Sequence, residues 1–112
     1  MSKFDAVMDK CVAQMREQKI PVNRPLLEAI GKSLGPSLYN RDASLVAARQ
    51  KSELETIKKK FLIKKLGCPD DAKLDKALEK AVTKIGPSRR NKMRPVFYYI
   101  LVKELKKESV YI

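Results

Sequence analysis

Residues 96–102 read Val96-Phe97-Tyr98-Tyr99-Ile100-Leu101-Val102, an apolar run that decides the fold. A helix that is apolar on every side lies at the centre of a core or is covered by a partner. β-Branched and aromatic residues also suit a buried strand, but the lysine-rich continuation over residues 103–107 favours a helix. A proline in a helix interior breaks a hydrogen bond, so Pro95 belongs in the first turn or at a junction between helices. We expect a helix that begins between Ser88 and Pro95 and ends near Lys107.

Helix start and stop signals divide the rest of the chain. Apolar residues recur three or four positions apart, which is the spacing of one helical face. Capping residues and Gly-Pro pairs bound the expected helices. These helices cover residues 3–18, 24–34 behind the N-cap Asn23, 43–49 behind Asp42, 52–66 behind a Ser52–Glu55 capping box, and 72–85 behind Asp70 or Asp71. Together with the last helix, they predict an all-α fold of five to six helices.

Two segments match each other at an offset of 51 residues. Leu34-Gly35-Pro36-Ser37 and Asn40-Arg41 in the first correspond to Ile85-Gly86-Pro87-Ser88 and Asn91-Lys92 in the second. Glycine supplies a left-handed helix end at each corner, and proline prevents extension of the helix. Alternatively, each corner presents the free amides of a helix N-terminus to an anion. We expect tandem duplicated helical hairpins, over about residues 23–67 and 70–107, packed as one compact domain.

The composition removes most catalytic chemistry. The chain has 112 residues, one domain by length, and no His. Without an imidazole, no Ser-His-Asp or Cys-His pair can form, and Cys11 and Cys68 alone cannot make a zinc site. We expect both to be reduced thiols that act as small apolar groups. The candidate acids Asp42, Glu55, Asp70 and Asp71 are explained by helix capping. The sequence therefore predicts no enzyme, no metal and no cofactor.

The sequence also shows no targeting or membrane segment. The first residues lead into a mixed polar and apolar pattern instead of the apolar region of a secretion signal. The longest unbroken apolar run is Val96 to Val102, far below the ~18 residues that suggest a membrane span. We expect a cytoplasmic protein.

Several motifs resemble a known family. They are Gly35-Pro36-Ser37-x-Tyr39-Asn40-x-Asp42-Ala43-Ser44-Leu45-Val46-Ala47, Phe61-Leu62-x-Lys64-Lys65-Leu66-Gly67, Arg90-Asn91-Lys92-x-Arg94-x-Val96-Phe97-Tyr98-Tyr99 and Glu108-Ser109-Val110-Tyr111. In this combination the chain resembles a family of small bacterial proteins described only as a domain of unknown function. The resemblance implies an all-α fold with a tandem hairpin repeat in a bacterial cytoplasm. It allows a dimer and implies no activity.

The favoured interpretation of function is a non-enzymatic interaction or structural module that associates with itself. The apolar last helix and the apolar tail are the features that would bury against a second copy or a partner. The same residues would otherwise form the core. The candidate interface residues are Tyr98, Tyr99, Val110, Tyr111 and Ile112.

The alternative is nucleic-acid or polyanion binding through a basic surface. The formal net charge is +12, and residues 53–67 and 87–112 hold most of it. If the hairpins stack, their cations form one surface that binds phosphates in a salt-dependent way. Tyr39, with Tyr98 or Tyr99, could stack on bases. The candidate contacts are Lys58, Lys59, Lys60, Lys64, Lys65, Arg89, Arg90, Lys92 and Arg94.

Overall fold

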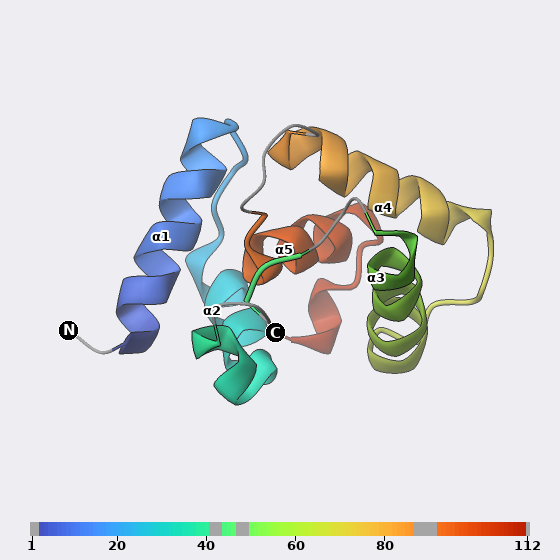
Figure 1. Ribbon diagram of the computed structural model, residues 1–112, viewed down its shortest axis with the longest axis horizontal. Coiled ribbons are helices and arrows are strands. Elements are labelled where there is room, and N and C mark those ends of the chain that lie inside the picture. Colours follow the sequence, from blue (N-terminus) through green and yellow to red (C-terminus); the bar gives the residue numbers. More distant parts are fainter. Residues whose placement is uncertain (1–2, 41–43, 47–49, 87–91, 112) are drawn as a thin grey trace.

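The computed structural model describes residues 3–40, 44–46, 50–86 and 92–111 (Figure 1). Over these ranges the chain is helical without strands, which confirms the all-α prediction. No helix in this part of the chain combines the length and the apolar content that a membrane crossing requires. The elements in chain order are α1 (Lys3–Glu17), α2 (Arg24–Leu34), the 3-10 helix η1 (Gly35–Tyr39), α3 (Lys51–Thr56), the π-helix η2 (Ile57–Lys65), α4 (Ala72–Ile85), α5 (Arg94–Glu104) and the 3-10 helix η3 (Glu108–Val110).

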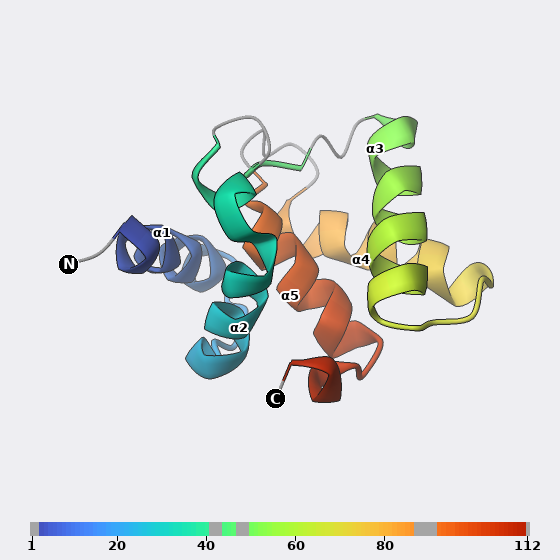
Figure 2. The same cartoon turned by 90° about the horizontal axis from the view of Figure 1, so that it is seen from below.

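The helix α5 is the centre of the fold. Every residue from Pro95 to Val102 is buried, and α1, α2 and α4 all pack against this helix. Figures 1 and 2 show α1 and α2 on one side of α5, with α3 and α4 on the other. The prediction of a central helix with Pro95 in its first turn is therefore confirmed. The helix ends at Glu104, three residues before the expected end, because Lys106 adopts a positive φ of 56°.

The first two helices follow the sequence pattern closely. α1 buries Met8, Cys11, Val12, Gln14 and Met15. The Asn23 side chain caps α2 as predicted, since its oxygen accepts a hydrogen bond from the Leu26 amide at 3.3 Å. α1 and α2 approach closely at Gly31, where an added Cβ would lie 2.7 Å from Met8 Cε. The Met8 and Phe4 side chains of α1 therefore occupy the space that a side chain at position 31 would need.

The prediction of a helix over residues 43–49 is wrong at residues 44–46, the part of this segment that the structure describes. Leu45 instead forms an isolated antiparallel bridge with Met93. The Val46 amide donates to the Lys92 carbonyl at 2.8 Å, and the Arg94 amide donates to the Ser44 carbonyl at 2.7 Å. Because these backbone groups form hydrogen bonds with residues 92–94, they do not require the hydrogen bonds of a helix. Asp42 and residues 47–49 lie outside the described residues.

The helix that follows begins one residue earlier than predicted. Its N-cap is Gln50, which makes no side-chain capping bond, so the predicted Ser52–Glu55 capping box is wrong. Ser52 falls inside the first turn, where its carbonyl accepts a hydrogen bond from Thr56 Oγ1 at 2.8 Å. The next cap is confirmed: Asp71 Oδ1 accepts a hydrogen bond from the Lys73 amide at 2.9 Å, and α4 ends before Gly86.

The structure does not confirm the tandem hairpin. α2 and the helix formed by α3 and η2 lie on opposite sides of α5 (Figure 2), and α2 packs against α5, η1 and α1. The connection through residues 44–46 crosses to the start of α5 and carries α3 to the far side, beside α4. Gly35 has the positive φ expected at the first corner, 60°, but Pro87 and Ser88 of the second corner lie outside the described residues.

Both cysteines are free and buried. Burial raises the pKa of the Cys11 thiol to about 12, and burial is also the main cause that raises the pKa of Cys68. Since the thiolate is the reactive form, we expect an aromatic disulfide reagent at about pH 8 to leave the native protein unmodified.

The same reagent should modify both thiols once urea unfolds the chain. The unfolded thiol ionises near its ordinary pKa of about 8.5 while the folded one keeps its proton, so the free energy of unfolding should also fall as the pH rises above that value. Rapid modification of both thiols in native buffer would contradict the burial of these side chains.

Candidate functional site

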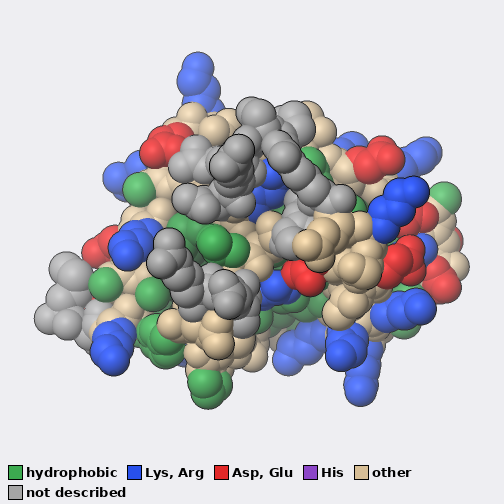
Figure 3. All heavy atoms as spheres, in the orientation of Figure 1, with side chains coloured by type: hydrophobic (Ala, Val, Ile, Leu, Met, Phe, Trp, Pro, Cys, Tyr) green, Lys and Arg blue, Asp and Glu red, His purple; other side chains and the backbone are tan. Residues whose placement is uncertain are grey.

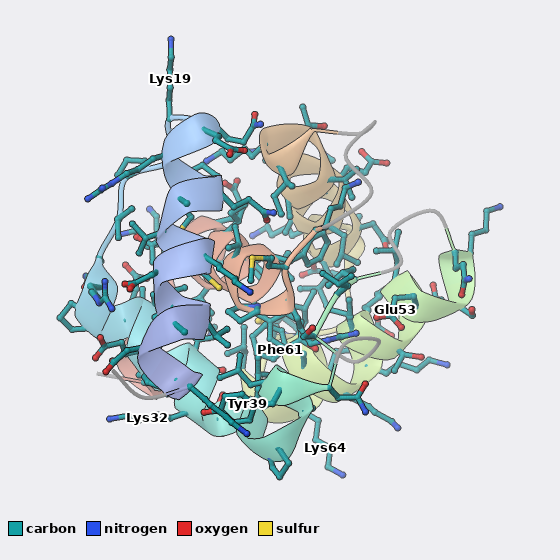
Figure 4. All side chains as sticks on the ribbon, turned by 60° about the vertical axis from the view of Figure 1, so that its left-hand side comes forward. Lys19, Lys32, Tyr39, Glu53, Phe61 and Lys64 are labelled. Atoms are coloured by element: carbon teal, nitrogen blue, oxygen red, sulfur yellow. The ribbon has the colours of Figure 1, made fainter. Side chains whose placement is uncertain are left out.

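The π-helix η2 carries an exposed row of lysines, which we call the lysine ridge: Lys59, Lys60, Lys64 and Lys65. Among the described residues, no carboxylate forms an ion pair with any of the four. In Figure 4 the labelled Lys64 points away from the body of the molecule, whereas Phe61 of the same helix points into it. The ridge is therefore a solvated, uncompensated row of positive charge.

The sequence of the π-helix η2 repeats in part after five residues. Hydrogen bonds in a π-helix join residues five apart, and the Leu66 amide donates to the Phe61 carbonyl in this way at 2.9 Å. The segment reads Ile57-Lys58-Lys59-Lys60-Phe61 and then Leu62-Ile63-Lys64-Lys65-Leu66, so four of the five positions repeat in type, and Lys58 against Ile63 is the exception. In this helix Ile57, Phe61 and Leu62 are buried, as is the C-cap residue Leu66, whereas Lys59, Lys60, Lys64 and Lys65 are exposed.

Lys58 does not belong to this ridge. Its side chain is 16% exposed, and its Nζ lies 3.5 Å from Asp70 Oδ1 and 3.2 Å from Asp75 Oδ1. The two ion pairs connect η2 to the region where α4 begins. Lys58 thus stabilises the packing of these two elements, and its charge is balanced within the protein.

The second predicted basic cluster does not form an exposed surface at the two of its residues that the structure describes. Lys92 is only 3% exposed. The Arg94 guanidinium donates to Glu53 Oε1 at 2.5 Å, to the Leu45 carbonyl at 3.1 Å and to the Tyr98 hydroxyl at 3.0 Å. Both cations are enclosed because residues 44–46 pair with residues 92–94, so neither is an open phosphate contact. Arg89 and Arg90 lie outside the described residues.

Two of the predicted interface residues belong to the core. The Tyr98 ring stacks on Phe61 with a centroid distance of 3.9 Å and an interplanar angle of 17°. The Tyr99 hydroxyl donates to the Pro21 carbonyl at 2.8 Å and accepts from the Asn23 amide at 3.0 Å. Tyr98 is 9% exposed and Tyr99 is 2% exposed. Neither ring is therefore free to reach a second subunit or a base.

The tail packs in part on the domain and approaches the ridge. The Lys65 ammonium lies 5.8 Å from the centroid of the Tyr111 ring, a cation–π contact. Tyr111 is half-buried against the core, and burial raises its pKa. Val110 remains 40% exposed, and Ile112 lies outside the described residues. Among the predicted aromatic contacts, Tyr39 is half exposed on η1.

The described residues contain no group of three or more His, Cys, Asp or Glu side chains that could hold a metal ion. Two of the four candidate acids have local roles, since Asp71 caps α4 and Asp70 pairs with Lys58. Glu55 is exposed on α3, and Asp42 lies outside the described part of the chain.

A search of curated proteins finds none that matches this chain. The model of one protein family, described as a protein of unknown function (DUF2853), matches residues 4–109. This match covers almost every element described above, from α1 to η3. The chain therefore belongs to the DUF2853 family.

Proposed function

We propose that this chain is a non-enzymatic binding module that holds a polyanion, nucleic acid foremost, on the lysine ridge. The observation that carries the proposal is the ridge itself: four exposed lysines on one short helix, with no carboxylate partner among the described residues. When lysines contact the phosphates of a nucleic acid, condensed counterions are released. This release drives binding that does not depend on the nucleotide sequence. A net charge of +12 adds long-range attraction.

The burial of Tyr98 and Tyr99 limits what this module can recognise. Neither ring is available to stack on an unpaired base, and lysines on a helix surface contact phosphates in any sequence. We therefore propose binding that depends on charge density and is indifferent to sequence. Self-association and a cytoplasmic setting remain predictions from the sequence.

The test is a titration of labelled random duplex DNA at two salt concentrations. If the four ridge lysines each contact a phosphate, the affinity should fall roughly 100-fold between about 50 and 200 mM salt. A variant with glutamine at all four ridge positions should bind far more weakly at the lower salt and should lose most of this salt dependence.

A charge-matched control separates the ridge from the net charge. This control places glutamine at four exposed lysines on other elements, Lys3, Lys10, Lys32 and Lys84. It should bind within a few-fold of the original protein. No binding at about 50 mM salt, or equal losses in the two quadruple variants, would contradict a role for the ridge.

A further inference from the structure

A groove of about 710 Å³ lies between α3 and α4, on the side of the molecule away from α1. Its apolar lining consists of Leu54, Leu78 and Val82, and Lys51 and Thr83 also line it. Carboxylates from both helices stand at its rim: Glu55 on α3, with Asp75 and Glu79 on α4. Figure 3 shows Asp and Glu side chains over α3 and α4, with Lys and Arg side chains beside them.

Two of these carboxylates are uncompensated. Among the acidic side chains in the described part of the chain, only Glu55 and Glu79 lack an ion pair or a hydrogen bond. Lys and Arg outnumber Asp and Glu by 25 to 13, so cations to balance them are abundant elsewhere on the chain. Both of these carboxylates line one groove with apolar walls, and they outnumber its single lysine, Lys51. The groove is therefore complementary to a ligand that is apolar and cationic.

The shape of the groove indicates the form of that ligand. Asp75, Leu78, Glu79 and Val82 are spaced i, i+3, i+4 and i+7 on α4, a stripe about 10 Å long at 1.5 Å per residue. The opposite wall is the first turn of α3. Two helical walls with an apolar lining accept a third helix, whose side chains pack between theirs.

We propose that the groove between α3 and α4 binds a basic amphipathic helix of a partner protein. The apolar face of that helix would cover Leu54, Leu78 and Val82. Lysines or arginines along its edges would pair with Glu55 and Glu79. The site is independent of the lysine ridge, which carries the opposite charge.

The probe is a synthetic amphipathic peptide of about four helical turns, with leucine at i, i+3, i+4 and i+7 positions and lysine elsewhere. Two further peptides serve as comparisons: one carries glutamate in place of lysine, and one has a scrambled order that destroys the apolar face. Binding is followed by isothermal titration calorimetry with the full chain that carries glutamine at the four ridge positions, because the glutamate peptide is a polyanion that the lysine ridge would otherwise bind. We expect the lysine peptide to bind and both comparison peptides to fail.

Variants of the chain locate the binding. Glu55→Gln combined with Glu79→Gln should weaken binding of the lysine peptide about three- to tenfold. Val82→Lys, which places a charge on the apolar lining, should weaken it more than tenfold. The charge-matched control, Asp9→Asn with Glu28→Gln on α1 and α2, should stay within about twofold of the original protein. Unfolding midpoints verify that each variant folds.

Three results would overturn the proposal. The glutamate peptide could bind as tightly as the lysine peptide, or the Glu55/Glu79 and control variants could lose the same affinity. The third result would be self-association of the chain in sedimentation experiments without peptide, together with its loss in the Glu55/Glu79 variant. That outcome would identify a second copy of this chain, and not a partner, as the occupant of the groove.

Discussion

Phe97→Ala is expected to lower the free energy of unfolding by about 3–5 kcal/mol. Phe97 lies on α5 and is the largest of the fully buried side chains, at the centre of a helix against which α1, α2 and α4 pack. Truncation removes the transfer free energy of the ring and leaves a cavity that the surrounding helices cannot fill. Since a chain of this size is stabilised by roughly 5–15 kcal/mol, the variant should be close to the limit of folding.

Urea unfolding followed by circular dichroism measures this change, and the midpoint of thermal unfolding should fall by roughly 12–20 °C. The matched control is Phe4→Ala on α1, because Phe4 is only partly buried against the same core. Phe4→Ala should lower the free energy of unfolding by about 1–2 kcal/mol. Equal losses in the two variants would show that α5 does not hold the position that its burial indicates.

Arg94→Met is expected to lower the free energy of unfolding by about 2–4 kcal/mol. The Arg94 side chain is 16% exposed and its partner Glu53 is 23% exposed, so the pair is largely desolvated. Removal of the guanidinium leaves a nearly buried carboxylate without a partner, a change that costs about 3–5 kcal/mol for a fully buried pair. It also removes hydrogen bonds to the Leu45 carbonyl and the Tyr98 hydroxyl. The partial exposure of both groups reduces the expected loss.

A double-mutant cycle in urea distinguishes this network from a simple loss of packing. Arg94→Met combined with Glu53→Gln should be less destabilised than the sum of the two single variants, because no unpaired charge remains. Arg94→Lys should recover less than half of the loss, since one ammonium cannot match three acceptors that a planar fork reaches together. Strict additivity would mean that the ion pair makes no net contribution to stability.

The features that the sequence predicts well are local ones. The run from Val96 to Val102 needs no distant partner to be recognised as a buried helix. The caps at Asn23 and Asp71 likewise depend on groups within three residues of the cap. Such features follow from dihedral preference and from the placement of apolar side chains along one helix.

Features that depend on contacts between segments far apart in the sequence could not be predicted from local patterns. Lys92 and Arg94 look like surface cations in the sequence, and only the pairing of residues 44–46 with residues 92–94 encloses them. That pairing is invisible to periodicity because it joins segments almost fifty residues apart. The π-helix is an intermediate case: its partial five-residue repeat is present in the sequence, but the apolar positions also fit a helix of 3.6 residues per turn.

The position of α5 in the chain order has a consequence for biosynthesis. α1, α2 and α4 bury their apolar faces against an element that begins at Arg94. The ribosome adds about 5–20 residues per second, so α1 and α2 are complete seconds before α5 is synthesised, and α4 is complete about one second before α5 begins. During this interval the apolar faces of α1, α2 and α4 lack the helix that covers them in the folded protein.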